Sequence, residues 1–227
     1  GYHMALALLD LGHRVDVLDL SLDNIGPLQR KFEGRLLCYE GDVRSESSVA
    51  QAVCAAADAF GGLDAAGQDA CLCPFSPFED TDGDVLKAAF YVNYFGAVNL
   101  TRSAAPHMRA GGRILFTSSG VGVTGFPNLT AYASTKGAIE SLAKCLRLEY
   151  ARQGLSFHIL HPPLTRTRSS APLPVPAEFM ASPEAVGRGL AKHLFSRHFI
   201  ICHSPWQRAQ TLMCYLAPLK FGSPMAR

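Results

Sequence analysis

Residues 111–150 read GGRILFTSSGVGVTGFPNLTAYASTKGAIESLAKCLRLEY, and this stretch sets the architecture of the chain. The short apolar run 113–117 is bounded by small residues, which predicts a buried strand. Glycines and a proline follow and predict a loop. From Thr130 onward, apolar residues recur at spacings of three and four, which predicts a helix. The segment is therefore a strand, a glycine-rich loop and a helix, in that order.

Three polar residues of this segment have a spacing that suits acid–base chemistry. Tyr132 and Lys136 are four residues apart, so they lie on one face of the predicted helix. Ser119 follows the predicted strand, where the loop can fold its hydroxyl over that face. A free tyrosine has a pKa near ~10, and a nearby lysine ammonium lowers it. The spacing by itself also fits an ordinary pair on a helix surface.

In order and spacing, Ser119 and the run Tyr132-Ala-Ser-Thr-Lys136 resemble the catalytic segment of the short-chain dehydrogenases/reductases. The resemblance implies a doubly wound, Rossmann-like α/β fold, with a mostly parallel sheet and helices on both faces, in a single domain over residues 1–227. It also implies hydride transfer between a nicotinamide cofactor and a small-molecule carbonyl or alcohol substrate.

The same resemblance implies a role for each catalytic residue. Tyr132 is the acid/base, Lys136 tunes it and binds the nicotinamide ribose, and Ser119 orients the substrate. Asn93, within Tyr91-Val-Asn-Tyr94, matches a fourth catalytic residue that supports a proton relay toward the lysine. A core asparagine that kinks its helix is a compatible interpretation of Asn93.

The resemblance also assigns the start of the chain. Gly1 matches the last glycine of the glycine-rich turn of the family, and Gly12 closes the predicted helix after it. The family has a first strand and the rest of that turn before this point, so we expect the sequence to be a fragment. A strand averages ~5–6 residues, so about a dozen residues would be absent. We expect the chain as given to bind NAD less well than a form that includes them.

Asp19 ends the second predicted strand of the family fold, where an acid can bind the adenosine ribose and repel a 2′-phosphate. Leu20 adds no positive charge, so we expect NAD to be preferred over NADP; a solvated strand-end aspartate is the alternative. By resemblance, further residues contact the cofactor. They are Gly1, Asp42, Val43, Ala70, Tyr132, Lys136, Pro162 and Thr167.

Two positions depart from the family pattern. Cys71 stands where a glycine lets the backbone approach the cofactor, with the charged Asp69 beside it. Pro163 replaces the glycine of a usual Pro-Gly. These departures leave a second function open, an inactive member of the family that acts as an interaction partner. A nucleotide-sugar epimerase is a third, but the short tail after Lys136 argues against it.

Size, charge and cysteine content bear on the number of domains and on binding to nucleic acids, membranes and metals. The 227 residues, 48% of them hydrophobic, suffice for one domain with a substantial core. A net charge of +2 gives no reason to expect nucleic-acid binding, and no apolar run reaches the ~18 residues of a membrane span. Most of the seven cysteines lie in apolar runs, which predicts reduced, core-packed thiols in the cytoplasm. Their spacing predicts no metal site.

Two segments remain after the catalytic helix. Residues 171–182 are rich in proline and predict a lid over the substrate. Residues 205–227 form a C-terminal tail that is apolar from Trp206 to Leu219, and we expect it to pack on a partner subunit rather than on a membrane surface. By resemblance, the helices that carry Asn93 and Tyr132 pack against their symmetry mates, which implies a homodimer or a homotetramer.

Overall fold

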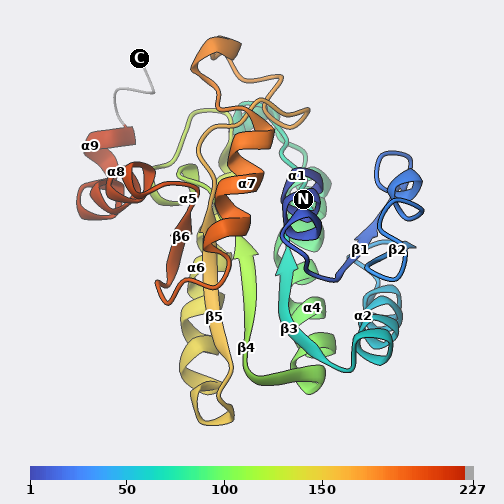
Figure 1. Ribbon diagram of the computed structural model, residues 1–227. Coiled ribbons are helices and arrows are strands. Elements are labelled where there is room, and N and C mark those ends of the chain that lie inside the picture. Colours follow the sequence, from blue (N-terminus) through green and yellow to red (C-terminus); the bar gives the residue numbers. More distant parts are fainter. Residues whose placement is uncertain (223–227) are drawn as a thin grey trace.

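Six parallel strands in two sheets form the centre of the computed structural model, which describes residues 1–222 (Figure 1). The strands are β1 (Val15–Asp19), β2 (Leu36–Glu40), β3 (Leu63–Gln68), β4 (Met108–Thr117), β5 (Ser156–His161) and β6 (Ile200–Cys202). The α-helices are α1 (Tyr2–Asp10), α2 (Glu46–Phe60), α3 (Gly83–Phe90), α4 (Gly96–Ala104), α5 (Val121–Thr124), α6 (Thr130–Glu149), α7 (Pro183–His193), α8 (Pro205–Leu216) and α9 (Pro218–Gly222).

The larger sheet has the strand order β3-β4-β5-β6, and every pairing in it is parallel. Its middle strands β4 and β5 pair from Arg113 opposite Ser156 to Thr117 opposite Leu160. Helices cover both faces of these strands, so side chains that point either way become buried. On one face Ile114, Phe116, Phe157 and Ile159 are fully buried, and Leu115 and Leu160, which belong to a second core cluster, are exposed by only 1%.

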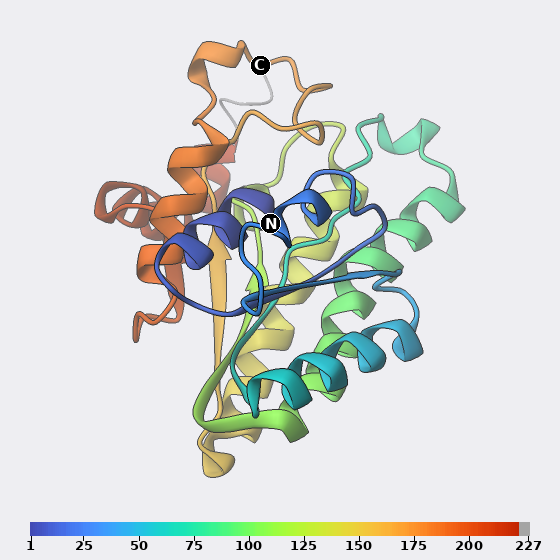
Figure 2. The same ribbon diagram turned by 45° about the vertical axis from the view of Figure 1, so that its right-hand side comes forward.

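Helices α1 and α7 pack together on one face of the strands, and α2, α4 and α6 lie on the other (Figures 1 and 2). The α1–α7 contact is closest at Gly187, where an added Cβ would lie 2.6 Å from the backbone of His3. Only a glycine lets the two helices approach this closely. The result is the doubly wound, Rossmann-like architecture that the sequence predicted.

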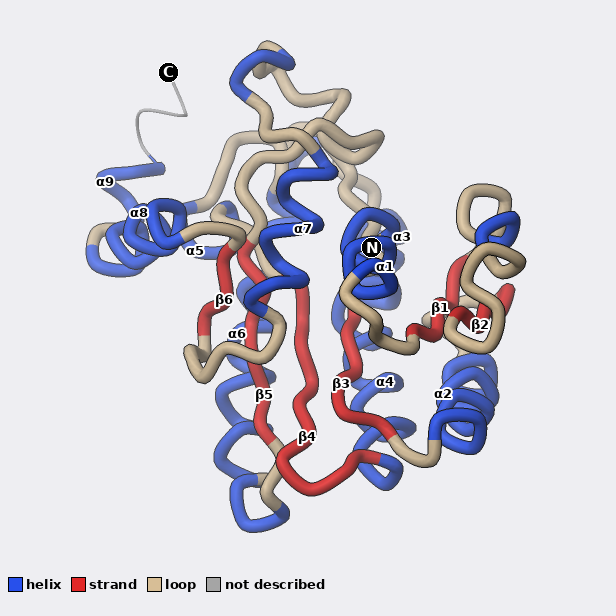
Figure 3. The backbone as a smooth tube through the Cα atoms, in the orientation of Figure 1, coloured by secondary structure: helices blue, strands red, loops and turns tan. Residues whose placement is uncertain are grey.

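The smaller sheet pairs β1 with β2, and Figure 3 shows this pair beside β3. Within residues 1–222, no strand joins β1 to β3. A cavity of about 820 Å³ lies there and is lined by residues of both strands.

Serine side chains cap helices α2 and α7. Ser45 caps α2 by accepting a hydrogen bond from the backbone of Ser48, and Ser182 caps α7 in the same way. A π-helical turn at Tyr91–Phe95 separates α3 from α4. The predicted lid, 171–182, contains a short 3₁₀ turn at Ala177–Phe179.

The prediction that the cysteines are core-packed was wrong. All seven thiols are free, but Cys202 alone is buried, and Cys54, Cys71 and Cys145 are exposed. Apolar neighbours in sequence do not bury a residue that lies on the outer face of its helix or in a loop.

The C-terminal tail forms α8 and α9, and its last residues, 223–227, lie outside the described part of the chain. Among residues 1–222, we find no helix with both the length and the apolar character needed to cross a bilayer.

A carboxyl group of β1 faces the interruption between the sheets. The Oδ1 atom of Asp16 is buried without a hydrogen-bond partner among the described residues. Burial raises the pKa of Asp16 to about 7. At pH values between the pKa of Asp16 in the unfolded chain, ~4, and its pKa in the folded chain, Asp16 is ionised in the unfolded chain and protonated in the folded chain. Stability therefore falls as the pH rises through this range, and the loss is complete above pH ~7.

Asp16→Asn removes this titration while it keeps the size of the side chain. We expect the variant to be more stable than the unmodified protein at pH 8 by on the order of 1–4 kcal/mol, and to gain little at pH ~4. Urea unfolding at both pH values measures the difference, with the exposed Asp58→Asn as the control. An equal gain at the two pH values would show that the carboxyl does not titrate as described.

Candidate active site

The first two turns of α6 place Tyr132 and Lys136 side by side, as the spacing predicted. Lys136 is almost completely buried, and its Nζ donates a hydrogen bond of 2.7 Å to the carbonyl oxygen of Thr117 at the end of β4. The same Nζ lies 5.3 Å from the centroid of the Tyr132 ring. The helix and the carboxyl end of the strand therefore meet at this pair of side chains.

Ser119 joins the pair from the loop after β4. Its hydroxyl forms a hydrogen bond with the Tyr132 phenol. The loop turns through the short helix α5 and lies directly against α6 at Gly122, where an added Cβ would be 2.7 Å from the Cβ of Lys136. A glycine is needed at this position because a side chain there would push the loop, and Ser119 with it, away from the helix.

The expected lowering of the Tyr132 pKa was wrong for this structure. Burial raises the pKa of Tyr132 well above its usual range, and the thiols of Cys71 and Cys73 act in the same direction. The hydrogen bond from Ser119 lowers it but does not reverse the shift. Burial also lowers the pKa of the Lys136 ammonium, because an apolar surrounding disfavours either charged form. Tyr132 is therefore a protonated phenol at neutral pH.

Asn93 lies in the π-helical turn and is fully buried. Its Nδ2 donates to the Thr135 hydroxyl at 2.9 Å and to the Leu72 carbonyl at 3.0 Å, and its Oδ1 accepts from the Leu72 N–H at 2.7 Å. The amide thus ties the loop after β3 to α6. Both polar atoms of the side chain are used in this way, so the observed contacts describe a structural link and the relay role stays a prediction.

The loop that Asn93 holds carries the two cysteines flanking Leu72. Its Leu72 backbone is held between them by the two hydrogen bonds to the Asn93 amide. Cys71 and Cys73 both interact electrostatically with Tyr132 and Lys136. The sequence did not predict that two thiols lie beside Tyr132.

The residues predicted to contact the cofactor divide into two groups. Gly1, Asp19, Val43 and Ala70 line the cavity between β1 and β3. The others lie outside its lining in the described part of the chain: Asp42, Tyr132, Lys136, Pro162 and Thr167.

Two members of the second group have partners of their own. A hydrogen bond from the Arg44 guanidinium, 2.8 Å long, lowers the pKa of Asp42. The backbone N–H of Thr167 donates to the Ser170 hydroxyl at 2.9 Å. The structure thus brings four of the predicted cofactor residues together around one cavity, and Tyr132 and Lys136 together on α6.

One cavity-lining residue has an unused acceptor. Gln68 donates from its Nε2 to the carbonyls of Ala70 and Val92 at 2.7 and 3.2 Å, whereas its Oε1 is buried without a partner among residues 1–222. Next to it, Asp69 accepts a hydrogen bond of 2.7 Å from the Thr117 hydroxyl and pairs with the amino group of Gly1. Unsatisfied buried acceptors are rare, so Gln68 marks a place for a donor from outside the chain.

A family model described as short chain dehydrogenase matches residues 1–175. The oxidoreductase UcpA of Escherichia coli is 33% identical over 165 residues, which is 71% of this chain and 60% of that protein. The chain spans only 51–60% of the length of the first curated relatives that it matches.

Solved structures share the fold. A short-chain dehydrogenase from Streptomyces avermitilis superposes with a TM-score of 0.83, at 21% identity over 97% of this chain and 89% of that one. A 3-ketoacyl-(acyl-carrier-protein) reductase from Brucella melitensis, complexed with NADH, gives a TM-score of 0.77 at 23% identity, over 87% of this chain and 86% of that one. At these identities the likeness concerns the fold alone.

Proposed function

Because this chain belongs to the short-chain dehydrogenase family, we propose that it is a nicotinamide-dependent oxidoreductase that interconverts a carbonyl and an alcohol on a small molecule. The observation that carries the proposal is the contact of Tyr132 with both Ser119 and Lys136 at the end of β4. This arrangement offers a proton donor, a second hydroxyl and a buried cation around one point.

The nicotinamide, when bound, supplies or accepts the hydride. In reduction, the Tyr132 phenol donates its proton to the substrate oxygen. Its raised pKa keeps that proton in place at neutral pH, which is the form that donation requires. Ser119 donates a hydrogen bond that stabilises the tyrosinate left behind, and it orients the substrate oxygen. Lys136 uses one of its three N–H donors on Thr117, so two remain for ribose hydroxyls.

The residues present fit the adenosine half of such a cofactor. The cavity between β1 and β3 holds the Asp19 carboxylate at its edge and the free Gln68 Oε1 in its wall, and both accept hydrogen bonds from hydroxyls. The Brucella reductase, which has the same fold, is complexed with NADH. We assign the nicotinamide ribose to Tyr132 and Lys136, and the adenosine side to Gly1, Asp19, Val43 and Ala70.

The proposal extends to assembly and compartment. Tyr91 and Phe95 of the π-helical turn and Leu148 of α6 are large apolar side chains that are exposed in the single chain. A symmetric homodimer or homotetramer would cover them. Free thiols at all seven cysteines support a reducing compartment such as the cytoplasm.

Tyr132→Phe tests the catalytic assignment. A general acid contributes about 10²–10⁴-fold, so we expect kcat to fall by that factor while the Kd for NADH stays within about threefold. NADH oxidation is followed over a panel of aldehydes and ketones, and Tyr150→Phe, at the far end of α6, serves as the control. Retention of more than about a tenth of the activity would refute the role of Tyr132. If the unmodified protein turns over none of the carbonyls, the inactive interaction partner becomes the better account.

The preference for NAD over NADP is tested separately at the end of β1. Both Asp19 and Leu20 are exposed there. The Asp19 carboxylate repels a 2′-phosphate, and the Leu20 side chain carries no charge that could attract one. We expect the unmodified protein to bind NADH more tightly than NADPH. The double change Asp19→Ser with Leu20→Arg should reverse the order, because it removes a repelling charge and adds an attracting one. Fluorescence titration of both cofactors measures the ratio, and tighter NADPH binding by the unmodified protein would contradict this interpretation.

A further inference from the structure

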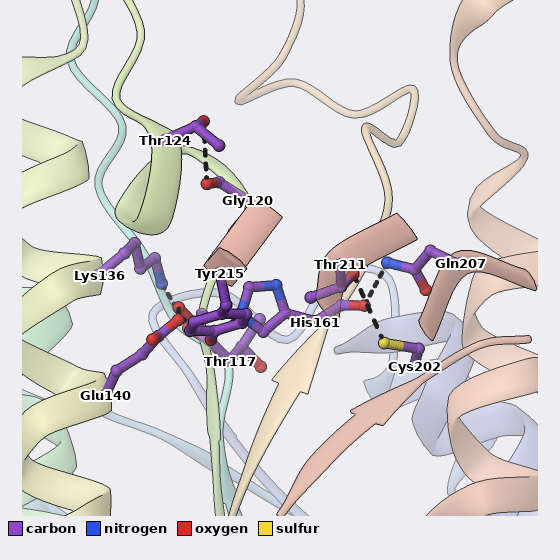
Figure 4. Close-up of polar contacts among 11 residues, drawn as sticks. Thr117, Gly120, Thr124, Lys136, Glu140, His161, Cys202, Gln207, Thr211 and Tyr215 are labelled. Carbon is purple, nitrogen blue, oxygen red and sulfur yellow. Dashed lines mark hydrogen bonds and ion pairs between the residues drawn. The ribbon is translucent and has the colours of Figure 1, made fainter. Parts of the chain in front are cut away.

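A second buried polar cluster centres on Glu140 of α6, four residues after Lys136 (Figure 4). The Glu140 Oε1 accepts hydrogen bonds from the Ser118 hydroxyl at 2.8 Å and from His161 Nε2 at 2.9 Å. The Tyr215 hydroxyl lies 3.0 Å from the same His161 nitrogen and donates to the Glu140 carboxylate. Three donors from three separate segments therefore converge on one carboxylate.

Glu140 continues a regular series along α6. Tyr132, Lys136 and Glu140 follow one another at four-residue spacing, so they occupy one face of the helix at steps of about 6 Å. Each of the three holds one residue of the same short segment at the end of β4. Tyr132 contacts Ser119, Lys136 binds the carbonyl of Thr117, and Glu140 binds the hydroxyl of Ser118. The orientation of Ser119 thus depends on contacts made by its two preceding neighbours.

The Glu140 carboxylate is ionised although it is buried. Burial raises its pKa, but the hydrogen bonds from His161, Tyr215 and Ser118 outweigh this effect and hold the pKa below its usual range. A buried carboxylate with several donors has a fixed orientation, since each lost donor would leave charge unsatisfied in an apolar surrounding. Glu140 is therefore a rigid anchor for Ser118.

The other side of the cluster belongs to the C-terminal helix α8. Tyr215 comes from the end of that helix, and Gln207 at its start donates from Nε2 to the His161 carbonyl at 2.6 Å. Both residues of α8 thus contact His161, the last residue of β5. Helix α8 is bonded to the strand end that lies next to the catalytic loop.

We propose that Glu140 is a positioning residue for hydride transfer, which fixes the end of β4 so that Ser119 and Lys136 keep their places around Tyr132, and that Tyr215 couples α8 to this arrangement. The inference rests on the proposed function, but its test includes a measurement that needs no turnover.

Glu140→Gln keeps the size of the side chain and removes its charge, so Ser118, His161 and Tyr215 no longer share an ionised acceptor. We expect kcat to fall at least about tenfold, with the KM for NADH changed by less than about threefold, because the residue acts on the reacting end of the site. Tyr215→Phe removes a single donor and should lower kcat by a smaller factor. Glu149→Gln, on the exposed end of the same helix, is the matched control.

The accessibility of Lys136 to acetylation can be measured without any enzymatic activity. Its ammonium is buried, whereas Lys144 on the same helix is exposed, so the two acylate at different rates in one sample. With trace acetic anhydride and mass spectrometry, we expect acetylation of Lys136 relative to Lys144 to rise at least about threefold in Glu140→Gln, at a temperature where the variant stays folded. Glu149→Gln should leave the ratio unchanged.

The outcomes separate the two proposals. An unmodified protein without turnover would contradict the proposed function, and the lysine ratio would still decide the positioning role. A lower melting temperature with an unchanged lysine ratio would make Glu140 merely structural and overturn this inference. If Glu140→Gln does not fold, Tyr215→Phe is measured in the same way, and a ratio equal to that of the unmodified protein overturns it.

Discussion

The hydrogen bond from Lys136 Nζ to the Thr117 carbonyl holds α6 against the end of β4, and the active site depends on it. A buried ammonium without a partner would cost several kcal/mol, so this carbonyl determines where the side chain can rest. The strand that supplies the carbonyl is paired on both sides, by β3 and β5, and cannot shift alone. Tyr132, the proposed acid/base, is thus positioned by a part of the sheet that is paired on both sides.

The sequence predicted what local spacing determines. Ser119, Tyr132 and Lys136 lie within eighteen residues, so a strand followed by a helix already places them near one another. It did not predict contacts between distant segments. Tyr215 interacts with Glu140, 75 residues away in the sequence, and Cys71 and Cys73 lie near Tyr132 in a loop that Asn93 holds. The high pKa of Tyr132 follows from that burial, which spacing alone does not reveal.

The two ends of the proposed cofactor site differ in how they are supported by the sheets. The catalytic end is continuous with the four-stranded sheet, whereas the adenosine end borders the interruption between β1 and β3. Here the chain also carries its departures from the family, with Asp69 and Cys71 near the strand end. Proteins that share a fold can have different activities. The function of this chain is therefore inferred from these residues and not from its structural similarity to other dehydrogenases.

Deuterium transfer follows the proposed reaction at the atoms concerned. The protein is incubated with NADH that carries deuterium at C4 of the nicotinamide and with a reducible carbonyl, and the alcohol is analysed by mass spectrometry. Our account predicts one deuterium on the carbinol carbon when the label is on the transferred face, and its loss when the opposite face is labelled. Alcohol without deuterium from either labelled form would contradict direct hydride transfer at the Tyr132 site.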